Sequence, residues 1–135
     1  MGYKITDIEG IGPAFADKLA TARITTTEDL LDMCATKQGR AKISDSTGIG
    51  EGTLLTWANM ADLMRISGIG GQYAELLKES GVDTVKELRT RNAENLATAM
   101  KKINDERNVT KGEASPKTVA DWIAKASELD PKITH

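Results

Sequence analysis

The chain has 135 residues, enough for one or two small domains that share a core. Its 39% hydrophobic and 28% charged residues are typical of a soluble globular protein, and no apolar run reaches transmembrane length. The net charge of −2 argues against a dedicated, tight nucleic-acid binder, and the single cysteine excludes an internal disulfide, which favours a cytoplasmic location.

The first half of the sequence is predicted to be helical. The apolar spacing that begins at Phe15 predicts a helix over residues 14–22. Thr27 is expected to cap a second helix that runs through Met33, because acidic residues fill its first turn. A longer helix is expected over residues 50–64.

The second half of the sequence is also predicted to be helical. A helix is expected over residues 92–103, followed by a longer one over residues 115–129. Ser115 is predicted to cap this last helix, with Pro116 at its first position, where the missing N–H costs nothing. No stretch alternates as a strand would, so the predicted fold class is all-α.

The sequence contains an internal repeat. Residues 10–30 align with residues 68–88 at a constant offset of 58, and Trp57 aligns with Trp122 at an offset of 65. The offset grows by seven because the second copy has a longer middle. A duplication of one unit explains both alignments.

The repeat suggests where the units begin and end. The first unit is expected over residues 1–64 and the second over residues 65–129, with a C-terminal tail over residues 130–135. No linker-like segment separates the copies, so the two are expected to pack as one compact body.

Three glycine turns recur along the chain. They are Gly10-Ile11-Gly12, Gly48-Ile49-Gly50 and Gly68-Ile69-Gly70. Glycine permits backbone angles that other residues avoid, and the central isoleucine can anchor each turn in the core. The turn's N–H groups and the next helix can then face an anion. Alternatively, each turn is only a tight connection between two helices and binds no ligand.

Residues 8–30, with Gly10, Ile11, Gly12 and Pro13, resemble the helix-hairpin-helix motif of DNA repair polymerases, ligases and RecA-like recombinase N-terminal domains. The resemblance implies that hairpin amides hold a DNA phosphate without reading sequence. A basic residue in the next helix, here Lys18, and a monovalent cation often assist; no other cofactor is expected.

The sequence also departs from that motif. Asp17 stands where a basic residue often lies, and in the second copy Gly71 replaces the proline and Leu76 the lysine. Over residues 8–129 the pattern resembles a bacterial helix-hairpin-helix family of unknown function. This wider resemblance implies the fold and transfers no activity.

Basic charge gathers in the second half. Residues 1–62 hold 6 basic and 9 acidic residues, whereas residues 63–135 hold 12 and 11. Eight basic residues lie between Lys86 and Lys117. They form either a solvated helix face or a patch that follows phosphates, centred on Lys111 and Lys117.

Other chemistry has little support. The only histidine, His135, is the last residue, where disorder is the usual state, and no metal-binding or nucleophilic set is visible. The chain is therefore not expected to be an enzyme. Phe15 and Tyr73 occupy equivalent apolar positions with the tryptophans, which favours core packing over base stacking.

The sequence thus favours weak, sequence-independent DNA binding. A protein-interaction or scaffold role of the same fold is the alternative, no membrane partner is expected, and the oligomeric state stays open. The expected phosphate-binding residues are Gly10, Ile11, Gly12, Lys18, Gly48, Gly50, Gly68, Gly70, Lys111 and Lys117.

Overall fold

The computed structural model describes residues 3–135, and within them every regular element is a helix, which confirms the all-α class. A short 3-10 helix, η1 (Ile5–Asp7), comes first. The α-helices are α1 (Pro13–Thr21), α2 (Thr27–Cys34), α3 (Lys37–Thr47), α4 (Glu51–Leu63), α5 (Gly71–Glu79), α6 (Val85–Leu88), α7 (Ala93–Arg107) and α8 (Pro116–Ser127). The single β-type contact within this part of the chain is an isolated bridge between Lys4 and Thr26.

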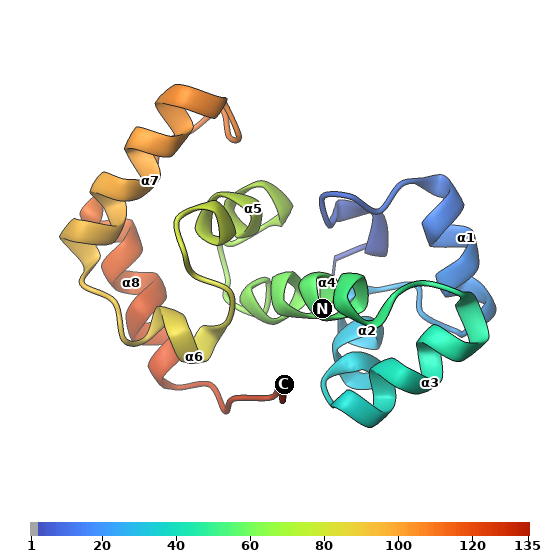
Figure 1. The fold of residues 1–135 in the computed structure, drawn as a ribbon. Helices are drawn as coiled ribbons and strands as arrows, with labels where there is room; N and C mark the ends of the chain where they lie inside the picture. Colours follow the sequence, from blue (N-terminus) through green and yellow to red (C-terminus); the bar gives the residue numbers. More distant parts are fainter. Residues whose placement is uncertain (1–2) are drawn as a thin grey trace.

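Helix α4 runs through the middle of the molecule (Figure 1). Helices α1, α2 and α3 lie on one side of it, and α5 to α8 lie on the other. Helix α4 packs against α2, α3 and α5, while α8 packs against α6 and α7. Most of α4 is therefore buried, and a continuous apolar core extends through both halves.

Side-chain caps fix the start of most helices. Ser115 accepts a hydrogen bond from the Thr118 N–H, with Pro116 at the first helical position, as predicted. The predicted cap at Thr27 is wrong by one residue. Thr26 is the cap of α2, because its hydroxyl accepts the Asp29 N–H while the Asp29 carboxylate accepts the Thr26 N–H.

Helix α3 was missed by the sequence reasoning. It contains Gly39, and Arg40 and Ile43 are its only fully buried side chains, so it carries little periodic apolar signal. Helix α7 was found but begins at Ala93 and extends four residues beyond the predicted end at residue 103. Those last residues are polar and mostly exposed, so they add nothing to the apolar periodicity from which the end of the helix was predicted.

The two tryptophans occupy equivalent environments, as the alignment predicts. Trp57 is 5% exposed and Trp122 is 3% exposed. The Phe15 ring packs edge-on against Trp57 with centroids 5.1 Å apart, and the Tyr73 ring packs against Trp122 at the same separation. Each tryptophan therefore supports the helix that follows a glycine turn.

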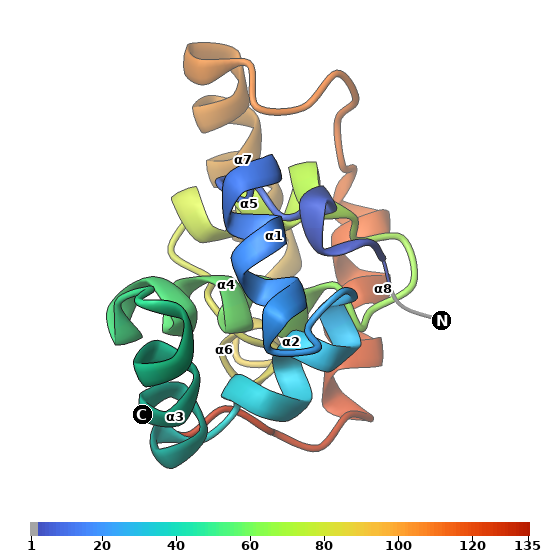
Figure 2. The same ribbon diagram turned by 90° about the vertical axis from the view of Figure 1, so that its right-hand side faces the viewer.

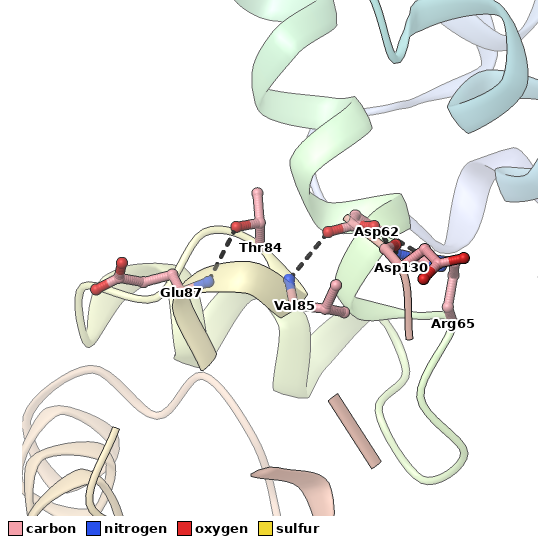
Figure 3. A network of polar contacts seen from close by, with 6 residues as sticks. All are labelled: Asp62, Arg65, Thr84, Val85, Glu87 and Asp130. Atoms are coloured by element: carbon pink, nitrogen blue, oxygen red, sulfur yellow. Dashed lines mark hydrogen bonds and ion pairs between the residues drawn. The ribbon is translucent and has the colours of Figure 1, made fainter. Parts of the chain in front are cut away.

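A buried carboxylate links α4 to α6 (Figure 3). Asp62 is almost fully buried, and one of its oxygens accepts the Val85 N–H at 2.9 Å. Its other oxygen accepts two hydrogen bonds from Arg65, which also donates to the carbonyl of Asp130. The buried charge is therefore fully partnered, as a buried ion requires.

The C-terminal segment returns to the first half of the chain. The buried guanidinium of Arg40 donates to the carbonyl of Thr134 at 2.6 Å, and the Thr134 N–H donates to the Ala35 carbonyl at 2.8 Å. The end of the chain accordingly lies beside α3 (Figure 2).

Candidate functional site

Each Gly-Ile-Gly turn contains one glycine in the left-handed region. The φ angles are +96° at Gly10, +77° at Gly48 and +98° at Gly68. The second glycines of the first and third turns, Gly12 and Gly70, are extended instead. At least one glycine in each of these two pairs therefore has positive φ, as predicted, and the three central isoleucines are buried.

The first and third turns share their local geometry. The Ile11 N–H donates to the Ile8 carbonyl at 3.1 Å, and the Ile69 N–H donates to the Ile66 carbonyl at the same distance. A Cβ on Gly10 would lie 3.4 Å from the Trp57 indole nitrogen. The close approach of the indole and the positive φ both favour glycine there.

The helices that follow these turns begin without a side-chain cap. Helices α1, α4 and α5 have Gly12, Gly50 and Gly70 as their N-caps, and none offers a side-chain acceptor. The other five α-helices of residues 3–135 begin at a threonine, asparagine or serine that accepts a backbone N–H. The glycine-capped helices thus leave first-turn N–H groups without a capping side chain.

The two turns of the first half are open. We call residues 10–12 and 48–50 the open turns. A Cβ built on Gly12 or Gly48 would meet nothing within 4 Å, and one on Gly50 would meet only the Thr53 hydroxyl at 3.9 Å. The glycines of both turns are exposed to solvent. The N–H groups of Ile11, Gly48 and Ile49 already donate hydrogen bonds within the chain. An anion could therefore reach the amides of Gly10, Gly12 and Gly50 without any rearrangement.

In the turn of the second half, residues 68–70, Gly68 is exposed, but Gly70 is partly buried beneath another segment of the chain. A Cβ on Gly70 would lie 3.8 Å from the Tyr3 ring, and one on Gly71 would lie 1.8 Å from the Asp7 carbonyl oxygen. Tyr3 is held there through Thr27, with which it exchanges two hydrogen bonds. We call residues 68–70 the covered turn.

Acidic residues surround the open turns. Glu9 precedes the first turn and Glu51 follows the second, and both are exposed. Asp17 and Lys18 are neighbours on α1, where the Lys18 ammonium lies 5.8 Å from the centre of the Phe15 ring. The electrostatic potential around the open turns therefore attracts an anion only weakly.

Carboxylates also gather beside the covered turn. Burial raises the pKa of Glu75, and the charges of Glu79 and Glu9 add to the increase, although Lys78 opposes it. Glu75 lies on α5, which follows the covered turn. The acidic side chain in this position makes that helix less attractive to a phosphate.

The basic stretch of the second half is partly neutralised. Three of its eight basic residues form ion pairs: Arg91 with Glu87, Lys101 with Asp105, and Arg107 with Glu79. The hydrogen bond to Asp105 is the main cause of the raised pKa of Lys101. The remaining five are exposed and have no ion pair among residues 3–135: Lys86, Arg89, Lys102, Lys111 and Lys117.

The structure does not bring all the predicted site residues together. Lys18 belongs to α1, whereas Lys117 belongs to α8 and Lys111 to the loop before it. Helices α1 and α8 lie at opposite sides of the molecule (Figure 1). The open turns and the unpaired lysines of residues 111–117 therefore form two separate regions.

A cleft of about 380 Å³ lies between α7 and the loop that joins it to α8. Its floor includes Leu76, Ala97 and Met100, and its rim includes the loop of residues 112–115. Asn104 holds this loop by exchanging two hydrogen bonds with Thr110. We call this feature the α7 cleft.

Sequence reasoning missed two features of the site. Phe15 was expected in the core, but its side chain is 37% exposed, because Leu19 is the one fully buried residue of α1. The cover over Gly70 was also missed, since it depends on a contact with Tyr3 across 67 positions. The replacement of the motif's proline by Gly71 was the sequence signal of a neighbouring contact, the one between Gly71 and the Asp7 carbonyl.

No other chemical centre emerges from residues 3–135. Burial raises the pKa of the Cys34 thiol to about 11, which keeps it in the unreactive protonated form. No group of three or more histidine, cysteine and acidic side chains is placed to hold a metal ion in this range. No helix found there combines the length and the apolar character needed to cross a membrane.

Comparison with known families gives one match. The model of the family described as "Domain of unknown function (DUF4332)" matches residues 9–129, which is most of the chain. Comparisons with curated proteins and with solved structures found no match.

Proposed function

We propose that this chain, which belongs to the DUF4332 family, binds the phosphate backbone of DNA weakly and without sequence preference. The observation that carries the proposal is the open, glycine-capped start of α1 and α4. N–H groups at such a helix start attract an anion through their hydrogen-bonding capacity and through the helix dipole. In this proposal the chain has no enzymatic role.

The same features support a helix-hairpin-helix interpretation of the turns. Gly10 and Gly68 share a positive φ, Ile11 and Ile69 are buried, and a tryptophan lies against each turn. We interpret the two halves as tandem copies of one helix-hairpin-helix unit. Within this interpretation only the first copy keeps its turns open to a ligand.

The charges near the open turns explain why binding is weak. Lys18 contributes one positive charge, while Glu9, Asp17 and Glu51 repel a phosphate. Non-specific DNA binding depends mainly on the number of phosphates that are neutralised. We therefore expect a dissociation constant of roughly 10⁻⁵ M or weaker at physiological salt.

Charge-reversal variants test the proposal. We would measure the anisotropy of a labelled duplex at low salt with wild-type protein, Lys18→Glu and Asp17→Lys. Lys18→Glu should weaken binding and Asp17→Lys should strengthen it. The double variant Lys111→Glu/Lys117→Glu measures the contribution of the second region and should have the smaller effect. Absence of binding by both the wild type and Asp17→Lys would show that the chain is not a DNA-binding protein.

One observation favours a second candidate function, the binding of a protein partner. The α7 cleft has a volume of about 380 Å³ and an apolar floor, and it lies far from the open turns. Exposed apolar surface with a polar rim is typical of protein-interaction sites. Replacing Ala114 by a larger residue should fill the cleft, and loss of a partner in that variant alone would support this role.

A further inference from the structure

Phe15 is the most exposed aromatic side chain of residues 3–135. Its exposed fraction is 37%, whereas both tryptophans are buried and both tyrosines are partly buried. Most large apolar side chains of residues 3–135 are in the core, and among them only Met33 has a comparable exposure. The position of Phe15 therefore calls for a reason other than core packing.

The ring lies beside the first open turn. Phe15 is three residues after Gly12, on the first turn of α1. Trp57 supports the ring from one side, with centroids 5.1 Å apart and planes at 70°. The Lys18 ammonium lies over one face of the ring, 5.8 Å from its centre. An aromatic ring, a cation and the amides of Gly10 and Gly12 thus lie next to one another.

The second half lacks this combination. Tyr73, which aligns with Phe15, packs against Trp122 in the same manner. Its hydroxyl, however, lies 3.1 Å from the position of a Cβ on Gly112, and the side chain is partly buried. The turn that precedes it is the covered turn. The aromatic ring and the second glycine of the turn are therefore both less exposed in the second half than in the first, although Gly68 is exposed.

We infer that Phe15 is a stacking platform for an unpaired base, so that the first open turn prefers single-stranded over double-stranded DNA. This inference rests on the proposed function, because the turn amides and Lys18 would hold the adjoining phosphate. Every base has a flat π face, so stacking on an aromatic side chain requires no particular sequence. In a duplex those faces are already covered by neighbouring base pairs.

The local charges favour a base at Phe15 rather than a second phosphate. Asp17 and Glu9 lie near the turn and repel anions, but they do not oppose the stacking of a neutral base. A base on the ring therefore adds affinity that electrostatics alone cannot supply here. We expect the stacking contact to strengthen single-strand binding by about tenfold.

The test compares three probes of equal length: oligothymidylate, the same strand with abasic sites throughout, and a duplex. Binding is measured at low salt by anisotropy, for wild type, Phe15→Ala and Phe15→Trp. Met33→Ala, which removes the other exposed large apolar side chain, is the matched control. Circular dichroism and thermal unfolding verify that each variant is folded.

The expected result is that Phe15→Ala weakens oligothymidylate binding about tenfold and leaves duplex binding unchanged. Phe15→Trp should retain the single-strand preference, and the abasic strand should bind wild type as weakly as oligothymidylate binds Phe15→Ala. Equal effects of Phe15→Ala on the three probes, or no effect on any, would overturn the inference alone. Failure of wild type to bind all three would overturn the proposed function. Self-association that disappears in Phe15→Ala would assign the ring to a protein contact instead, and would likewise overturn the inference.

Discussion

The backbone carbonyl oxygen of Asp7 lies 1.8 Å from the position that a Cβ atom on Gly71 would occupy. Any side chain at position 71 would therefore clash with η1 unless one of the two segments moved. This contact explains why the first residue of α5 is glycine, although the corresponding residue of α1 is Pro13. It also ties the start of the chain to the covered turn.

Gly71→Ala is predicted to destabilise the protein by about 1–3 kcal/mol, because overpacking forces the backbone to shift. Gly52→Ala is the matched control, since a Cβ there meets nothing within 4 Å on α4. That control should stabilise the protein by about 0.4–1 kcal/mol. Urea unfolding measures both changes, and equal stabilities of the two variants would contradict the contact.

Trp57→Ala and Trp122→Ala should each cost about 3–5 kcal/mol, because both side chains are buried. Each substitution also removes the ring against which Phe15 or Tyr73 packs. Chemical denaturation gives the free energy of unfolding of each variant. A loss below about 1 kcal/mol at either position would be incompatible with a supporting role of the tryptophan in its half.

The cap of α2 predicts a pH dependence of stability. The Asp29 carboxylate accepts the Thr25 and Thr26 N–H groups, and the hydrogen bond from Thr25 is the main cause of its lowered pKa. A carboxyl group whose pKa is lower in the folded state stabilises the protein above its unfolded pKa, about 3.9. This stabilisation is lost as the pH falls through the lower folded value.

Asp29→Asn should therefore cost about 1 kcal/mol at pH 7 and much less at pH 2. Glu87→Gln is the control, because Glu87 follows the equivalent cap Thr84 but pairs with Arg91. The comparison requires thermal unfolding of the wild type and the two variants between pH 2 and pH 7. A cost that stays the same at both pH values would exclude the charged cap as the cause.

Much of the fold could be predicted from the sequence because the relevant signals are local. The cap at Ser115, the helix over residues 50–64 and the positive φ of Gly10 follow from residue types and short spacings. Helix α3 could not be found, because it is mostly polar and its buried Arg40 bonds to backbone carbonyls that lie far apart in sequence.

The candidate site was less predictable for a related reason. All three glycine turns look alike in sequence, yet Tyr3 and Asp7 cover only the third. Whether a turn is open depends on which distant segment packs against it. The same limitation applies to Phe15, whose alignment with the partly buried Tyr73 gave no sign of its exposure.

The salt dependence of duplex binding should be shallow. If the first open turn with Lys18 and the patch of Lys111 and Lys117 together neutralise about three phosphates, the logarithm of the binding constant should fall with the logarithm of salt concentration with a slope near −2.7. Anisotropy titrations at several salt concentrations give this slope. A slope of −6 or steeper would require about twice as many cations at the interface as Lys18, Lys111 and Lys117 offer.

The most direct test of the central claim is a ¹H–¹⁵N spectrum of the protein titrated with DNA. If the open turns bind phosphate, the amide signals of residues 10–15 and 48–53 should shift together with DNA concentration. Those of residues 68–72, beneath Tyr3 and Asp7, should remain in place. Shifts confined to residues 68–72 or 111–117, or none at saturating DNA, would contradict the account.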